Sequence, residues 1–228
     1  MNYSIKVNEV KSKDSNVRGF ATVVFGDSFK ITNIAILENK EKEQLFVSMP
    51  RYRSSEKDEK GSNIYKDVCN PITAEFREEL YASILETYQK VIAQTEEQTP
   101  KQQRVQEPPA FSVTVTPYER EGSNIKGLAR IYLEDSFIIN NVNILQGKEN
   151  LFIAMPAYKT KQTDEKGKPV YQDVCYPVTK DFRQKLYDEI MSEYEQAKEK
   201  NQSEARSNAE KKADDPEKKQ EREATPFR

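Results

Sequence analysis

The chain alternates apolar and polar positions over short stretches. In the segment 29–37, Phe29 and Ile31 alternate with Lys30 and Thr32, and this period of two is typical of a strand with one face toward solvent. The same signals predict further strands and one short extended piece, at Ile5–Val10, Gly19–Phe25, Leu45–Met49 and Ile64–Val68. Because the connections between them are of hairpin length, the pattern favours an antiparallel sheet.

A helix is predicted after these strands. The segment D-V-C-x-P is expected to form a turn that leads into it, with Thr73 as the N-cap. Apolar residues then recur four positions apart, at Phe76, Leu80, Ile84 and Tyr88. Such a stripe is the buried face of an amphipathic helix that lies on a sheet. Strands followed by a helix predict an α+β fold.

The whole pattern occurs twice. The stretch Leu45–Gln89 recurs without a gap as Leu151–Glu195, and about half of the aligned positions are identical. The remaining second-copy elements are expected at Val113–Thr116, Gly127–Leu133, Phe137–Leu145, Leu151–Met155 and, after the N-cap Thr179, the helical stripe Phe182, Leu186, Ile190 and Tyr194. A domain of this size has a thin core of its own. We therefore predict two tandem small domains, each an antiparallel sheet with a C-terminal amphipathic helix, packed as an intramolecular pseudo-dimer.

Composition along the chain sets the expected boundaries. The first copy is expected at 1–93 and the second at 111–197. Residues 94–110 are polar and interrupted by prolines, which is typical of a linker. Residues 198–228 are charged and nearly free of apolar side chains, so we expect a solvated and disordered tail that is helical only near its start. Further self-association of the pseudo-dimer stays open.

The overall composition excludes several classes of protein. The chain has 36 Lys and Arg against 38 Asp and Glu, which argues against nonspecific wrapping of nucleic acid. It contains no histidine and no C-x-x-C, so we expect no catalytic residue, no metal site, no cofactor and no enzymatic activity. No apolar run marks a signal peptide or membrane span, which favours a cytoplasmic protein. Cys69 and Cys175 are expected to be small buried thiols that are not joined.

A locally basic loop is predicted after the M-P dipeptide of each copy. Lys and Arg in such loops can neutralise phosphates, and Gly61 and Gly167 would allow a tight turn. The candidate nucleic-acid contacts are Arg51, Arg53, Lys57, Lys60 and Lys66 in the first copy and Lys159, Lys161, Lys166 and Lys168 in the second. Tyr52 and Tyr158 are candidates for stacking on bases. The alternatives are an ordinary solvated loop and tyrosines that pack on the sheet.

These motifs resemble the SpoVG (stage V sporulation protein G, septation regulator) family. The resemblance is carried by L-F-V-x-M-P at Leu45–Pro50 and D-V-x-x-P-I at Asp67–Ile72, and it extends over Val7–Tyr88 and Val115–Tyr194. Family members are small homodimers that bind nucleic acid as regulators of septation, sporulation, or virulence and surface genes. The resemblance therefore implies a dimer fused into one chain. It also implies DNA contacts at the basic positions after M-P and before Asp67, which here are Arg53, Lys159 and Lys66.

The sequence leads to one prediction and one alternative. The prediction is a nucleic-acid-binding regulator whose partners are DNA, RNA or both. The alternative is a protein-interaction or assembly module that kept the fold and lost nucleic-acid binding, which the net charge of −2 favours. The copies also depart from the family and from each other, because Arg51 and Lys66 correspond to Ala157 and Gln172. We expect the first copy to bind more tightly.

Overall fold

The computed structural model describes residues 1–12, 14–93, 107–118 and 120–213, with side chains as far as residue 204. Most of the predicted linker, 94–106, and the last part of the predicted tail, 214–228, lie outside the described residues. The domain boundaries expected from the sequence therefore stay predictions.

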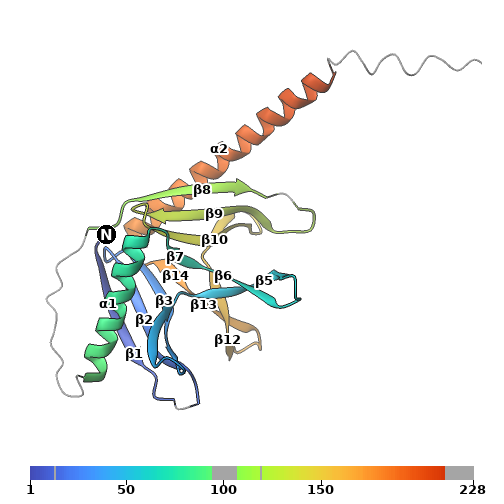
Figure 1. Ribbon diagram of the computed structural model, residues 1–228. Helices are drawn as coiled ribbons and strands as arrows, with labels where there is room; N and C mark the ends of the chain where they lie inside the picture. Colours follow the sequence, from blue (N-terminus) through green and yellow to red (C-terminus); the bar gives the residue numbers. More distant parts are fainter. Residues whose placement is uncertain (13, 94–106, 119, 214–228) are drawn as a thin grey trace, which may run out of the picture.

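Both copies contain the same elements in the same order (Figure 1). The first copy consists of β1 (Tyr3–Glu9), β2 (Val17–Phe25), β3 (Phe29–Asn39), β4 (Gln44–Ser48), β5 (Arg51–Lys57), β6 (Asn63–Asp67), β7 (Cys69–Pro71) and α1 (Ala74–Ala93). The second consists of β8 (Phe111–Pro117), β9 (Ile125–Leu133), β10 (Phe137–Gln146), β11 (Leu151–Ala154), β12 (Ala157–Thr163), β13 (Pro169–Asp173), β14 (Cys175–Pro177) and α2 (Lys180–Ala213). The predicted α+β architecture with two tandem domains is confirmed.

The two main sheets are completed by an exchange of strands between the copies. Within the described residues each of these sheets has five strands, ordered β1-β2-β3-β14 and β11-β10-β9-β8, with β4 also on β3 and β7 also on β10. Thus Cys175 of the second copy pairs with Ile31 of the first, and Cys69 pairs with Ile139. The prediction of a turn around each cysteine is wrong, because each segment forms a short strand in the other copy's sheet. The predicted pseudo-dimer is therefore interlocked.

Backbone hydrogen bonds beside the exchanged strands repeat in both directions. The Val178 amide donates to the Ser28 carbonyl at 2.8 Å, and the Ile72 amide donates to the Ser136 carbonyl at 2.9 Å. At the other end, the Thr32 amide bonds to the Val174 carbonyl at 2.8 Å. These bonds satisfy backbone groups that a separate copy would leave at a sheet edge.

A bulge divides the edge of β3 and of β10 between two neighbours. The pairing of β10 with β9 shifts between Ile139 and Val142. Within that shift Asn141 has φ 58°, and its counterpart Asn33 has φ 59°. Asparagine adopts this left-handed conformation more easily than most side chains. The bulge ends pairing with the exchanged strand, and the remainder of β10 pairs with β11.

The helices and aromatic rings form one core that crosses the boundary between the copies. α1 packs on β1 and β4, and α2 packs on β8. The ring centroid of Phe25 in the first copy lies 5.1 Å from that of Phe137 in the second. Phe76 of α1 joins this group at 6.3 Å from Phe25. Its amide also bonds to the Thr73 hydroxyl at 3.4 Å, as the N-cap prediction requires.

The two cysteines meet in this shared core. Cys69 and Cys175 are both buried and free. Their thiols lie within hydrogen-bonding reach, and this contact together with burial raises the pKa of Cys69 well above its ordinary value. Both features favour the protonated, unreactive thiol.

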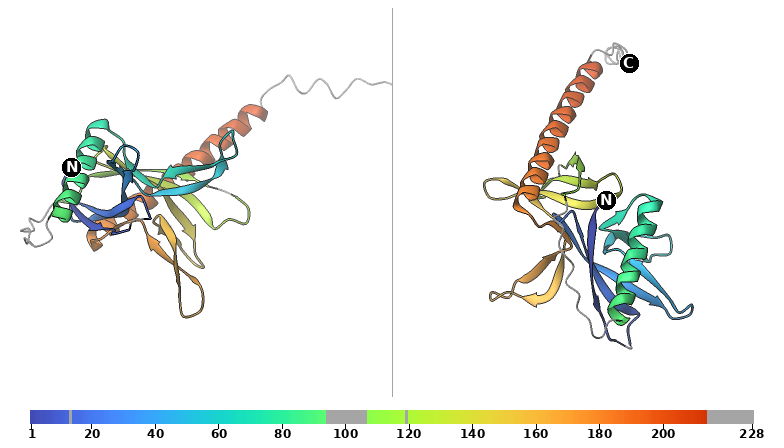
Figure 2. Two further views of the ribbon diagram at one scale, coloured as in Figure 1. Left: turned by 60° about the horizontal axis from the view of Figure 1, so that its bottom comes forward. Right: turned by 90° about the vertical axis from the view of Figure 1, so that its left-hand side faces the viewer.

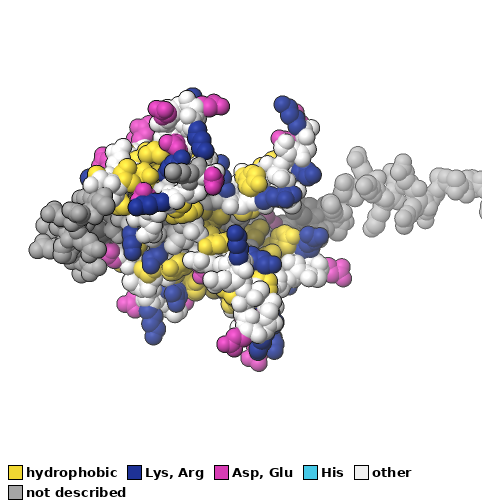
Figure 3. Space-filling model, turned by 90° about the horizontal axis from the view of Figure 1, so that it is seen from below, with side chains coloured by type: hydrophobic (Ala, Val, Ile, Leu, Met, Phe, Trp, Pro, Cys, Tyr) yellow, Lys and Arg dark blue, Asp and Glu magenta, His cyan; other side chains and the backbone are white. Residues whose placement is uncertain are grey.

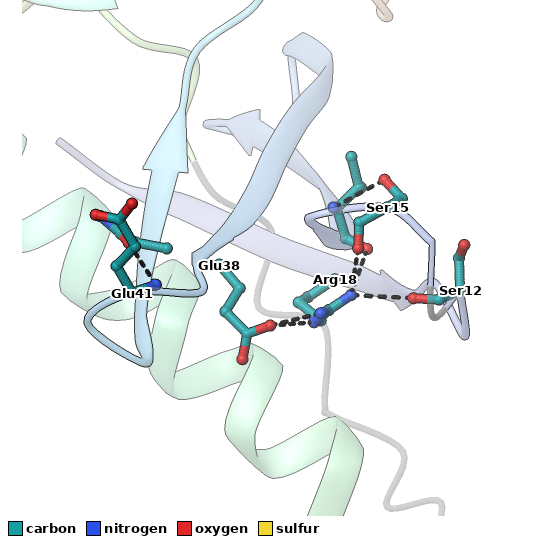
Figure 4. Close-up of polar contacts among 7 residues, drawn as sticks. Ser12, Ser15, Arg18, Glu38 and Glu41 are labelled. Carbon is teal, nitrogen blue, oxygen red and sulfur yellow. Dashed lines mark hydrogen bonds and ion pairs between the residues drawn. The ribbon is translucent and has the colours of Figure 1, made fainter.

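The copies differ at the far end of the sheet. In the first copy the Arg18 guanidinium donates to the carbonyl oxygens of Ser12 at 3.0 Å and Ser15 at 2.8 Å, and its Nε donates to the Glu38 carboxylate at 3.0 Å (Figure 4). These bonds hold the β1–β2 connection against β3. Lys126 and Gln146 stand at the corresponding places of the second copy, so this ion pair belongs to the first copy alone.

α2 extends well beyond the body of the molecule (Figure 2). It continues to Ala213, and its side chains from Glu199 to Glu204 are exposed. The segment predicted as a charged tail therefore begins as a solvated helix. None of the helices that the structure describes is both long and apolar enough to cross a membrane.

Candidate nucleic-acid interface

The basic segments after M-P are β-hairpins. β5 pairs with β6, and β12 pairs with β13, each pair forming its own small antiparallel sheet. The sequence predicted loops here, and that prediction is wrong for most of each segment. The two hairpins project from the main sheets (Figures 1 and 2). They therefore present their side chains on arms that project from the body of the molecule.

One aspartate shapes the tip of each hairpin. The Asp58 carboxylate accepts hydrogen bonds from the amides of Lys60 at 2.9 Å and Ser62 at 2.7 Å. Asp164 holds the second tip in the same way. Gly61 has φ 76° and Gly167 has φ 74°, so both occupy the conformation that glycine adopts at no steric cost. The expected glycine turns are present, and these two acids have a structural role.

Two of the candidate cations are already engaged in ion pairs. Arg51 Nε lies 2.8 Å from Asp67 Oδ1, and Lys66 Nζ lies 2.7 Å from Glu56 Oε2. The hydrogen bond to Glu56 and its charge raise the pKa of Lys66. Both pairs are exposed to solvent, so water and salt screen them. A phosphate can compete for either cation only by displacing its carboxylate.

The other candidate cations are unpaired. No ion pair or side-chain hydrogen bond to another described residue engages the charged groups of Arg53, Lys57, Lys60, Lys159, Lys161, Lys166 and Lys168. Lys and Arg side chains lie across the face seen from below, both on its projecting lobes and between them (Figure 3). The second hairpin keeps all four of its candidate lysines unpaired, whereas the first keeps three candidate cations.

The two candidate tyrosines lie differently. Tyr52 is half-buried and packs against the core. Tyr158 is 38% exposed, and its hydroxyl donates to Gln172 Oε1 at 2.7 Å. Tyr52 therefore has the packing that the alternative interpretation expects, while Tyr158 presents part of its ring to solvent.

The sequence analysis missed a second pair of tyrosines. Tyr65 is 59% exposed and Tyr171 is 64% exposed, and these are the largest exposed fractions among the bulky apolar side chains that the structure describes. Tyr65 pairs across the hairpin with Arg53, and Tyr171 pairs with Lys159. Residues opposite each other in a hairpin share a face, so each hairpin presents a ring beside an unpaired cation. The signal was the recurrence of Tyr in I-Y-K-D and V-Y-Q-D.

Comparison with known proteins identifies relatives of each copy. The SpoVG family model matches residues 1–90 and 109–196. A SpoVG septation protein of Thermoanaerobacter sp. is 32% identical over 79 residues, which cover 35% of this chain and 79% of that protein. Its namesake in Phytoplasma australiense is 33% identical over 73 residues, 32% of this chain and 70% of the relative. The SpoVG septation protein of Staphylococcus carnosus is 29% identical over 75 residues, which cover 33% of this chain and 64% of that protein.

Each relative thus covers about one copy, and the family model matches most of the chain in two segments that contain the same fold. The chain belongs to the SpoVG family and contains two tandem copies of its domain.

Proposed function

We propose that this chain is a cytoplasmic, non-enzymatic regulatory protein that binds nucleic acid through its two β-hairpins. The observation that carries the proposal is the pairing of an exposed tyrosine with an unpaired cation on each arm, Tyr65 with Arg53 and Tyr171 with Lys159. The relatives' name points to septation as the process in which it acts.

The chemistry of these pairs suits a phosphate backbone and its bases. Arg53 and Lys159 can each neutralise a phosphate and release counterions. The neighbouring ring offers a face on which any base can stack. Because the two arms belong to one interlocked body, binding by the first raises the effective concentration of the second. The interaction would therefore depend strongly on salt and only weakly on base sequence.

A protein-interaction module is the second candidate. Its support is the neutralisation of Arg51 by Asp67 and of Lys66 by Glu56, on a chain whose net charge is −2. An arm with internal ion pairs and an exposed tyrosine also suits a protein–protein interface, where tyrosine and arginine are enriched.

The first prediction separates these candidates by titrating labelled DNA and RNA at several salt concentrations. The wild type should bind with an affinity that falls steeply as salt rises. Arg53→Ala and Lys159→Ala should each reduce the slope of log K against log salt by about 0.7–0.9, the loss of one phosphate contact. Tyr65→Ala and Tyr171→Ala should each weaken binding by about 1–3 kcal/mol, the loss of one stacked base, and should leave the salt slope unchanged.

Lys90→Ala is the matched control, because Lys90 is an exposed lysine of α1 away from both hairpins. It should behave as the wild type. Wild-type binding that is absent at roughly tens of micromolar, or that does not respond to salt, would contradict nucleic-acid binding and favour the interaction module.

A further inference from the structure

A polar cavity lies between the first copy's hairpin and the second copy's sheet. Its volume is about 680 Å³, and it is open on one side to solvent. Tyr52 and Lys66, which pair across the hairpin, form one wall. The opposite wall is the exposed face of β8 and β9, with Thr114 and Arg130. We call this cavity the inter-copy groove.

The floor of the groove comes from the strand exchange itself. Asn70 belongs to β7, which pairs with β10. Asn141 occupies the bulge that ends this pairing. The Asn141 amide and the Arg130 guanidinium have no hydrogen-bond or ion-pair partner among the described residues. The Asn70 amide donates to the Pro71 carbonyl at 3.2 Å, and the Asp67 carboxylate in the lining is paired with Arg51. The groove therefore combines an unpaired cation, the free side-chain amide of Asn141, threonine hydroxyls and the edge of a tyrosine.

The equivalent positions between the second copy's hairpin and the first copy's sheet carry side chains of different size and chemistry. Tyr176 stands where the groove has Asn70, and its ring lies 5.7 Å from Lys30 Nζ. Gln172 replaces Lys66, and Thr22 replaces Arg130. That side retains a lysine, Lys6, in place of Thr114. A larger tyrosine engaged with a lysine thus stands where the groove has an asparagine.

We propose that the inter-copy groove binds one unpaired strand of nucleic acid. This inference rests on the proposed function and specifies its ligand. Arg130 flanks the groove as an unpaired cation and can hold a phosphate, and Lys66 can hold a second one by displacing Glu56. Asn70, Asn141 and Thr114 can form hydrogen bonds with base edges, which are accessible only when the bases are unpaired. Tyr52 offers the rim of its ring to a base. Arg53 and Tyr65 are the next pair along the same hairpin and face away from the groove, because successive side chains of a strand alternate between its faces.

The shape of the groove is the reason for choosing a single strand. Base edges of a duplex lie inside its grooves, so a protein reads them with an element that protrudes, such as a helix or a ribbon. Here the side-chain amides of Asn70 and Asn141 lie at the bottom of a concavity, beneath a hairpin. An extended strand can enter that space with its bases turned inward, whereas a duplex can rest only on its rim.

The test exchanges the residues that distinguish the two sides. The full chain is titrated with a labelled oligothymidylate of about 20 nucleotides, with oligouridylate of the same length and with a matching DNA duplex. Asn70→Tyr places in the groove the side chain that its counterpart already accommodates, and Arg130→Gln removes the unpaired cation. Each should weaken single-strand binding about tenfold, with little effect on the duplex. The reciprocal variant Tyr176→Asn should not weaken it. The two single strands report whether DNA or RNA is preferred.

Circular dichroism and thermal melting show whether each variant is folded, and Arg130→Gln changes an exposed side chain, so it provides a test even if Asn70→Tyr unfolds. Wild-type affinity in folded Arg130→Gln or Asn70→Tyr would overturn the groove proposal, while loss of binding in Arg53→Ala would still support the hairpins. Equal weakening for duplex and single strands would also overturn it. No binding of any probe by the wild type would overturn both proposals.

Discussion

Acidic side chains in the two hairpins make specific contacts that organise the basic ones. Asp58 holds its turn through two backbone amides, Asp67 holds Arg51, and Glu56 holds Lys66. Their charges lower the net charge of the first arm, yet they leave Arg53 unpaired, opposite Tyr65 in the hairpin. At the scale of single residues, the identity of the unpaired cations says more about binding than the sum of charges.

The bulge asparagines lead to a prediction about stability. Asn33 has φ 59°, a conformation that costs a β-branched residue about 1–2 kcal/mol. Asn33→Val should therefore lower the free energy of unfolding by about that amount, as measured by urea denaturation. Asn33→Gly is the matched control and should change it little, because glycine adopts positive φ without strain. Equal stability of the two variants would show that the backbone conformation at this bulge carries no cost.

Residue patterns predicted the packing and missed the pairing partners. Phe76, Leu80, Ile84 and Tyr88 are all buried, as their spacing indicated. The partners of Arg51 and Lys66 could not be predicted, because an ion pair across a hairpin depends on its register. Tyr65 was missed for the same reason, since its exposure follows from which face of the hairpin it occupies.

At the scale of elements, the strands with alternating apolar residues were predicted and the exchanged ones were not. β2 and β3 bury every second residue over much of their length, which a single sequence displays. β5 and β6 are charged on both faces and lack that signal. β7 has only three residues, and its hydrogen-bond partner lies in the other copy, so no local pattern identifies it as a strand.

The helices provide a matched test of how equally the two copies are packed. Leu80 of α1 and Leu186 of α2 occupy the same repeat position and are both fully buried. Leu80→Ala and Leu186→Ala should each lower the free energy of unfolding by about 2–5 kcal/mol, because each leaves a cavity in the core. Denaturation followed by circular dichroism measures the loss.

Glu78→Ala, at an exposed position of the same helix, should change the free energy of unfolding by less than about 0.5 kcal/mol. Since the core is shared, both leucine variants should unfold in a single transition. Two separate transitions would contradict a common core.

At the scale of the whole molecule, the two copies share their sheets and their core. Each main sheet contains a strand from the other copy, and Phe25 packs on Phe137 across the boundary. The repeat in the sequence predicted two domains that pack together, as the structure confirms. It could not predict the exchange, because both a simple face-to-face contact and interlocked strands are compatible with the same repeat.

The exchange predicts the behaviour of a single copy. A fragment of residues 1–93 keeps β7 and loses its partner β10, and it keeps β3 and loses its neighbour β14. Two such fragments can satisfy each other, so the fragment should purify as a homodimer. Light scattering should give twice the fragment mass, and the full chain should give the mass of one chain. A folded monomeric fragment would contradict the need for exchange.

The order in which the chain is synthesised gives the exchange a further consequence. A ribosome completes β1 to β4 long before it reaches Cys175–Pro177, the strand that fills the remaining edge of β3. Throughout that interval the nascent first copy exposes unpaired backbone groups at Phe29–Ile31, and an open edge can pair with the wrong chain. On a polysome, neighbouring nascent chains offer such wrong partners. Translation of the second half is therefore the step that ends this exposure.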